Sequence, residues 1–169
     1  GAHADNDLNI QEFMIRPDSA KNFMDAIEKC FIVIQNLKIL LQSKKMLTNV
    51  GDEGGFAPSI NSNEEALELI VQSIEKSNLK PGSDIVICLD VADNELMNKN
   101  GEYSVQSNSF MSVNNVIAYY KNLTSIYPIK LFFCTEYSSF LFINSLAATS
   151  RQITMSLPGF QFYLSIDWT

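Results

Sequence analysis

Apolar residues recur at helical spacing in the first part of the chain. Up to about Lys45 they fall three or four positions apart and so line one face of a helix, which we expect Asp18 or Ser19 to cap. That face carries Phe23, Ala26, Ile27, Cys30, Ile34, Leu37 and Leu41. The short apolar run Ile10–Ile15 precedes the helix and is bounded by Arg16-Pro17, a pattern that predicts a strand.

Two further helices are predicted from caps that are followed by apolar periodicity. Ser62 and Glu65 form a capping box. The serine side chain accepts from an unpaired backbone N–H group, and the glutamate side chain reaches back to accept from a backbone N–H group at the start of the helix. The helix behind them is expected to end near Lys80-Pro81-Gly82. Ser112 caps the other helix. The apolar side of that helix holds Val116, Tyr119, Tyr120, Leu123 and Ile126.

Runs between the helices predict strands. Ile85–Leu89 is apolar throughout, as expected of a strand buried on both faces of a parallel sheet. Tyr127-Pro128-Ile129 predicts the entry to another strand. Asn100-Gly101 is a two-residue hairpin signal, and we expect it to join Glu95–Met97 to Tyr103–Val105.

The order of these elements indicates an α/β fold. Helices that alternate with buried strands are typical of a parallel sheet. Only about three such strands are predicted, which is too few to close a barrel and leaves a sheet edge open.

Composition is typical of a globular protein and argues against two kinds of partner. The 169 residues suffice for one domain with a sizeable core, and 46% hydrophobic with 18% charged residues are globular values. The net charge is −7 and Lys and Arg are scattered without a basic stripe, which argues against nucleic acid. The most apolar stretch, Leu131–Ala148, contains Glu136 and several Ser and Asn residues, so it makes a poor membrane span.

Cysteine usage and the start of the chain indicate a reducing compartment. Cys30, Cys88 and Cys134 have neither metal-type nor disulfide-type spacing, which fits buried thiols. The opening residues, GAHADND, are polar and acidic and lack the pattern of a secretory signal.

The chain changes character near Ile129. Residues 130–169 contain four charged residues, while the preceding 129 residues contain 27. Nine of the 18 aromatic residues lie in that last stretch. We therefore divide the chain into a segment 1–129 and an apolar tail 130–169.

Three single residues could carry chemistry, and each has an ordinary alternative. Glu12 lies inside an apolar strand; it is either an outward-facing acid on an edge strand, which we favour from the residues alone, or a charge near the carboxyl end of a barrel strand, where active sites gather. Asp90 ends a strand. An acid in that position is either a turn or N-cap residue or a ligand of a hard metal ion. His3 is the lone histidine, and near a terminus such a residue is more often surface decoration.

The stretch VGDEGGFAP sets Asp52 and Glu53 against glycines between two predicted helices. Asp and Gly are turn formers, so a plain turn is one interpretation. A carboxylate brought close to a ligand by a tight loop is the other. The chain has no GxSxG nucleophile motif and no GxxxxGK[ST] phosphate loop.

Three stretches together resemble the enolase family. They are HADNDLNIQEFMI (His3–Ile15), NVGDEGGFAPSINSNEEALELI (Asn49–Ile70) and LDVADNEL (Leu89–Leu96). The resemblance covers about residues 1–129 and implies a partial TIM-like (β/α) barrel with about three strands, not closed. It also implies a cytoplasmic glycolytic lyase, phosphopyruvate hydratase, that interconverts 2-phosphoglycerate and phosphoenolpyruvate with two Mg²⁺ ions, usually as a homodimer.

The resemblance implies a role for five residues of this chain. Glu53 matches the general acid that protonates the departing hydroxyl, and Glu12 matches a second carboxylate that shares this hydroxyl. Gln11 matches a substrate-contacting amide, and His3 matches a histidine on a loop that closes over the substrate. Asp90 matches the first of three carboxylates that bind the tighter Mg²⁺.

The sequence departs from the family pattern at Lys130. There the family continues with a strand of the type V-S-I-E-D-G, whose glutamate is the second metal ligand, whereas this chain reads Lys130-Leu131-Phe132-Phe133-Cys134. The N-terminal domain, the first barrel strand, the third metal ligand and the base lysine are expected to be missing. A frameshift, an intron read-through or a gene-model error would explain why resemblance and composition change at one point.

We therefore expect an enolase-family fragment that carries the general-acid half of the site and is inactive by itself. The alternative is a non-catalytic truncated enolase-like protein that acts through binding, for example to a complete enolase chain at an open sheet edge.

Overall fold

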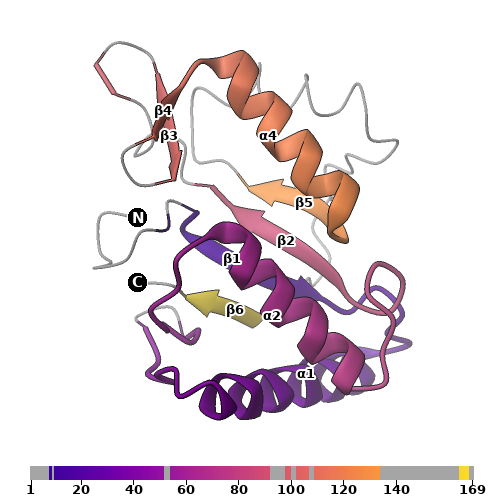
Figure 1. The fold of residues 1–169 in the computed structure, drawn as a ribbon. Coiled ribbons are helices and arrows are strands. Elements are labelled where there is room, and N and C mark those ends of the chain that lie inside the picture. The colour runs from indigo at the N-terminus through magenta and orange to yellow at the C-terminus, as the bar shows by residue number, and fades with distance from the viewer. Residues whose placement is uncertain are drawn as a thin grey trace.

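The computed structural model describes residues 8, 10–51, 54–91, 98–99, 102–106, 109–133 and 164–167. Four strands form the main sheet, two more form a hairpin, and three helices are present in this part of the chain (Figure 1). In chain order they are β1 (Glu12–Arg16), α1 (Phe23–Ser43), α2 (Asn63–Lys76), β2 (Val86–Asp90), β3 (Tyr103–Gln106), β4 (Ser109–Met111), α4 (Val113–Ile126), β5 (Ile129–Phe133) and β6 (Leu164–Asp167).

The main sheet is mixed, so the prediction of a parallel sheet is wrong for β1. The strand order is β5-β2-β1-β6, with β2 and β5 parallel and β1 antiparallel to both of its neighbours. The connection between β1 and β2 explains the difference. A single crossover helix returns the chain to the start of a parallel strand, whereas two helices, α1 and α2, separate β1 from β2 and allow β2 to enter from the opposite end.

The expected barrel strands β1, β2 and β5 are present, and the four-stranded sheet that the described residues form does not close. A fourth strand comes from the tail, because β6 pairs antiparallel with β1 from Glu12↔Asp167 to Ile15↔Leu164. The sheet edge of β1, which three strands alone would leave open, is therefore paired. The division at residue 129 falls inside the continuous strand β5.

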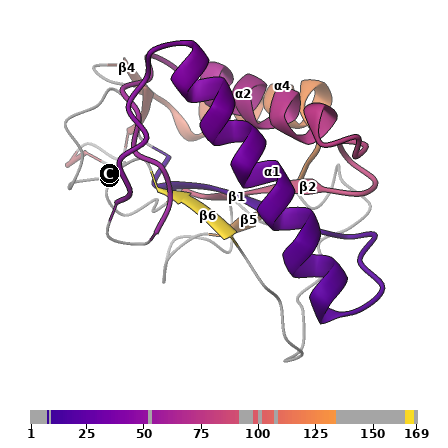
Figure 2. The ribbon, with the colours of Figure 1, turned by 90° about the horizontal axis from the view of Figure 1, so that it is seen from below.

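The two faces of the sheet are buried in separate clusters. Alternate residues of β1 and β2, among them Phe13 and Leu89, join the main core together with buried side chains of all three helices. Figure 2 shows α2 and α4 on one side of the sheet. The opposite face contributes a small cluster of Met14, Val86 and Cys88. In a closed barrel this second face would be the interior.

The ends of α1 differ from the prediction. Its N-cap is Asn22, whose side chain accepts from the Asp25 N–H group at 3.0 Å, and not Asp18 or Ser19. Asp18 is held by Arg16 instead, so it cannot serve as a cap. Phe23 was expected on the buried face, but as the first residue of the helix it is 51% exposed. The chain leaves the helix at Lys45, which adopts a φ of 61°.

The caps of the other helices were predicted correctly. Ser62 accepts from the Glu65 N–H group at 3.1 Å, and Glu65 reaches back to the N–H group of Asn61 at 3.2 Å. The helix ends at Lys76, four residues before Lys80. Ser112 caps α4. Ile126 was expected on the apolar side of α4 but is 62% exposed at its last turn.

The predicted hairpin at Asn100-Gly101 stays a prediction, and a later hairpin lies within the described residues. The Asn98 N–H group donates to the Glu102 carbonyl at 2.9 Å, so described residues on either side of Asn100-Gly101 are bonded to each other. Residues 95–97, the expected first strand, lie outside the described residues. The strand β3 covers the expected second strand and pairs with β4, which follows it directly.

Candidate functional site

Two of the predicted site residues lie opposite each other at one end of the sheet. Glu12 is the first residue of β1 and Asp90 the last residue of β2, and the antiparallel register pairs them. Residues in register on antiparallel strands project from the same face and have Cβ atoms about 5 Å apart. The sheet therefore places two carboxylates side by side on its second face.

Burial corrects the interpretation of Glu12 that the residues alone favoured. Its side chain is 4% exposed, and β1 lies between β2 and β6, so Glu12 is neither outward-facing nor on an edge strand. It shares a face with Met14, while Asp90 shares that face with Cys88 and is half-buried. Glu12 is thus a buried acid beside the carboxyl end of β2, where functional residues of barrels gather.

Gln11 adjoins this pair. Its backbone N–H group donates to the Asp90 carbonyl oxygen at 3.0 Å, which extends the bonding between the two strands by one residue beyond Glu12. The Gln11 side chain is half-buried. The structure therefore places the backbone of Gln11 beside the Glu12–Asp90 pair.

The other two predicted residues, His3 and Glu53, lie outside the described residues, but the frame of the acidic turn is described. The Gly51 N–H group donates to the Gly55 carbonyl at 2.9 Å, and the Gly54 N–H group donates to the Gly51 carbonyl at 3.1 Å. Gly54 has a φ of 89°, a conformation that other residues rarely adopt. The glycines therefore serve to close a tight turn on either side of residues 52–53.

The acidic turn is anchored on both sides. Val50 and Phe56 form an antiparallel bridge, and the Ala57 N–H group donates to the Asn49 carbonyl at 2.8 Å. Phe56 and Ile60 are buried in the main core. The described residues on both sides of the acidic turn are therefore fixed to each other and to the core.

Sequence reasoning missed a buried polar junction next to this segment. Asn63, the first residue of α2, is fully buried, and its amide nitrogen donates to the Val105 carbonyl at 3.0 Å and to the Tyr119 hydroxyl at 3.1 Å. It joins α2, β3 and α4. Burial raises the pKa of Tyr119, so its hydroxyl stays protonated at neutral pH. An asparagine at a helix start resembles a capping residue, so the sequence carried no distinct signal.

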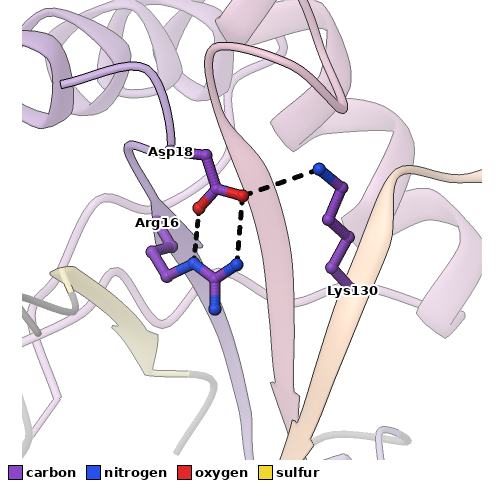
Figure 3. Close-up of polar contacts among 3 residues, drawn as sticks. All are labelled: Arg16, Asp18 and Lys130. Carbon is purple, nitrogen blue, oxygen red and sulfur yellow. Dashed lines mark hydrogen bonds and ion pairs between the residues drawn. The ribbon is translucent and has the colours of Figure 1, made fainter. Parts of the chain in front are cut away.

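A charge cluster occupies the opposite end of the sheet. Arg16 Nε contacts Asp18 Oδ1 at 2.5 Å, and Lys130 Nζ lies 3.5 Å from Asp18 Oδ2 (Figure 3). Burial alone would raise the pKa of Asp18, but the hydrogen bonds and charges of Arg16 and Lys130 hold it below its usual value. Since this end lies away from Glu12 and Asp90, we assign the cluster to stability.

The buried thiols are unsuited to nucleophilic chemistry. Burial raises the pKa of Cys30 to about 11 and that of Cys88 to about 12. Both cysteines are free. At neutral pH they remain thiols, whereas the thiolate is the nucleophile and metal ligand.

The donor set can be tested against the Mg²⁺ that the resemblance implies. Asp90 and Glu12 offer the carboxylate oxygens that this hard ion prefers. Within the described part of the chain, however, no group of three or more His, Cys, Asp or Glu residues could hold a metal ion. The described residues by themselves therefore do not make up a complete metal site.

This architecture defines an α/β protein of the barrel class with acidic residues gathered at the carboxyl end of β2. The family model described as "Enolase, C-terminal TIM barrel domain" matches residues 1–134, and the chain belongs to this family. It is 58% identical over 130 residues to a protein named enolase from Pelagibacter ubique (strain HTCC1062). The match covers 77% of this chain but 31% of that relative. No helix among the described residues is long and apolar enough to cross a membrane.

Proposed function

We propose that this chain supplies the general-acid side of an enolase-type active site. The site would act on 2-phosphoglycerate and phosphoenolpyruvate in the cytoplasm as part of glycolysis. The observation that carries the proposal is the pairing of Glu12 with Asp90, which sets a buried acid beside a half-buried one at the strand end where a barrel enzyme binds its substrate.

The proposed roles follow the chemistry of each group. Glu53 acts as general acid toward the departing hydroxyl. Hydrogen bonds among Gly51, Gly54 and Gly55 hold together the backbone on either side of it. Glu12 accepts a hydrogen bond from the same hydroxyl and holds it in place. Gln11 and His3 contact the substrate.

A divalent metal ion belongs to the proposed site, with Asp90 as one ligand. When bound, Mg²⁺ stabilises negative charge that develops on the substrate. A single carboxylate, that of Asp90, falls short of the ligands that a Mg²⁺ ion needs, so a tight site requires ligands from elsewhere. We therefore propose that a polypeptide of these 169 residues binds Mg²⁺ weakly and has no enolase activity by itself.

Complementation tests the proposal. The 169-residue polypeptide is assayed for Mg²⁺-dependent formation of phosphoenolpyruvate, first alone and then with a polypeptide that carries the remaining barrel and N-terminal domain of an enolase relative. We expect activity only in the mixture. Glu53→Gln and Glu12→Gln should abolish it, while the exposed substitution Asn114→Ala on α4 should not. Activity of the chain alone, or full activity of both glutamate variants in the mixture, would refute the proposal.

A second function, binding without catalysis, is favoured by the sheet edges. Within the described strands, β5 pairs with β2 alone, and we propose that its other edge binds a strand of a complete enolase chain. A pull-down between the two chains distinguishes the functions, because binding without restored activity supports only the second.

A further inference from the structure

The strand β6 comes from the end of the chain and covers one edge of β1. It pairs with four of the five residues of β1, from Glu12↔Asp167 to Ile15↔Leu164. The other edge of β1 pairs with β2 along its whole length, from Glu12 to Arg16. Figure 1 shows β6, in yellow, at the margin of the sheet that lies away from β5. Among the described strands, β1 therefore has a hydrogen-bonded neighbour on each side.

The residues of β6 do not belong to the part of the chain that matches the enolase family. The match ends at residue 134, so it contains β1, β2 and β5 but not β6. A TIM barrel is a closed sheet, in which every strand has a neighbour on both sides. A barrel that combines these three strands with strands of another polypeptide must therefore place one of the added strands beside β1. In this chain β6 already occupies that place.

Two strands cannot pair with the same edge of β1. Neighbouring strands lie about 4.8 Å apart, and an edge offers a single row of N–H and C=O groups. The pairing of β6 is intramolecular, so an incoming strand competes with an effective concentration far above that of a second polypeptide in dilute solution. The contested stretch of β1 ends on Glu12, a residue of the proposed site.

The pairing of β6 has features of a strand that can detach. It is shorter than the pairing of β2, with four residue pairs against five. At its end, the register position opposite Glu12 is Asp167, and Asp90 stands opposite Glu12 on the other side. Acids in directly opposite positions weaken the pairing of two strands. An incoming strand without an acid at this position would pair with β1 more favourably than β6 does.

We propose that β6 is an autoinhibitory strand, which occupies the edge of β1 and keeps a barrel-completing polypeptide away from it. This inference rests on the proposed function and adds a means of regulating the same site. Detachment of β6 exposes the edge from Glu12 to Ile15, where a strand of the second polypeptide then pairs. The edge of β5 is unaffected, because β6 lies at the other end of the strand order.

Binding of a complementing polypeptide tests the proposal. The probe is the remaining barrel and N-terminal domain of an enolase relative, and its dissociation constant is measured with the 169-residue chain and two variants. Deletion of residues 164–169 removes β6. Ile166→Pro disrupts it at the position opposite Phe13, because proline cannot donate to a strand ladder. Each variant should bind the probe at least about tenfold more tightly than wild type, because the intramolecular competitor is lost.

Thr169→Pro is the matched control. It introduces the same residue type two positions beyond the end of β6, and should leave the dissociation constant unchanged. Each variant is also unfolded in urea to show that it keeps a cooperative transition. Loss of that transition in both β6 variants overturns the proposal, because β6 is then a required part of the fold and not a detachable strand.

Formation of phosphoenolpyruvate is measured in the same mixtures, so that the two proposals fail separately. Tighter binding of both β6 variants without any activity supports autoinhibition and refutes the proposed function. Activity in the mixtures, with the same dissociation constant whether or not β6 is present, supports the proposed function and overturns autoinhibition. Autoinhibition is also overturned if neither β6 variant binds the probe better than wild type, or if Thr169→Pro tightens binding equally.

Discussion

Glu12 of β1 stands directly opposite Asp90 of β2, so two acidic side chains share one face of an antiparallel pair. Like charges in this position destabilise a sheet, by about 0.2–1 kcal/mol for a cross-strand pair. A sequence selected only for stability would avoid the arrangement. Its presence on a buried face fits a site that trades stability for function.

The first prediction measures this repulsion with Glu12→Gln, Asp90→Asn and the double variant. Asp90→Asn should raise the free energy of unfolding, and its effect should shrink in the Glu12→Gln background, because the repulsion is then already absent. Urea denaturation at neutral pH gives the coupling energy from the double-mutant cycle. The same cycle at a pH low enough to protonate carboxylates is the control and should show little coupling. A coupling of the opposite sign at neutral pH would mean that the two acids attract.

The second prediction concerns the junction made by Asn63. Asn63→Ala removes both donated hydrogen bonds and leaves the Val105 carbonyl without this donor, so unfolding free energy should fall by about 1–3 kcal/mol. Tyr119→Phe should cost less, about 0.5–1.5 kcal/mol, because the bond to Val105 survives. Tyr127→Phe is the matched control, since the Tyr127 hydroxyl has only a 3.5 Å contact with exposed Glu68. Equal losses for the two tyrosine variants would contradict the prediction.

The third prediction concerns pH and Asp18. The folded-state pKa of Asp18 lies below its ordinary value, so the charged carboxylate is favoured in the folded state and adds stability at pH above that ordinary value. This stability is lost as the pH falls through the depressed pKa. Asp18→Asn should therefore lower the free energy of unfolding at pH 7 by up to about 1 kcal/mol, a value limited by partial exposure of the pair.

The pH profile provides the check on Asp18. The difference between wild type and Asp18→Asn should stay constant from neutral pH down to about pH 4 and then vanish below it. High salt should reduce the difference at pH 7, because the pair with Lys130 is partly exposed. A difference that persists at the lowest pH would show that Asp18 stabilises the fold through something other than its charge.

The sequence predicted local features well, because their signals are local. The capping box at Ser62, the cap at Ser112 and the strand that ends on Asp90 all depend on neighbouring residues, and the structure has each of them. Asn22 was overlooked as the cap of α1 because Asp18 and Ser19 are equally good cap types. The contact between Arg16 and Asp18 decides against Asp18, and the start of α1 at Phe23 decides against both residues.

Features that depend on pairing could not be predicted in the same way. The sequence identified Glu12 and Asp90 separately, but only the antiparallel register makes them neighbours. Asn63 and Tyr119 are 56 positions apart, and no local pattern distinguishes a junction from a cap. The burial of Glu12 also follows from strand order, because β6 comes from the far end of the chain to pair with β1.

The last prediction tests that pairing by deleting residues 164–169. Successive N–H groups of β1 alternate between its two neighbours, so deletion should speed hydrogen exchange at the alternate β1 amides that face β6 and leave those that face β2 protected. The edge of β1 that the deletion exposes should also increase association of the chains at high protein concentration. Amides that join β2 to β5 are the internal control and should not change. Exchange that stays the same at every amide of β1 would show that β6 does not protect this edge in solution.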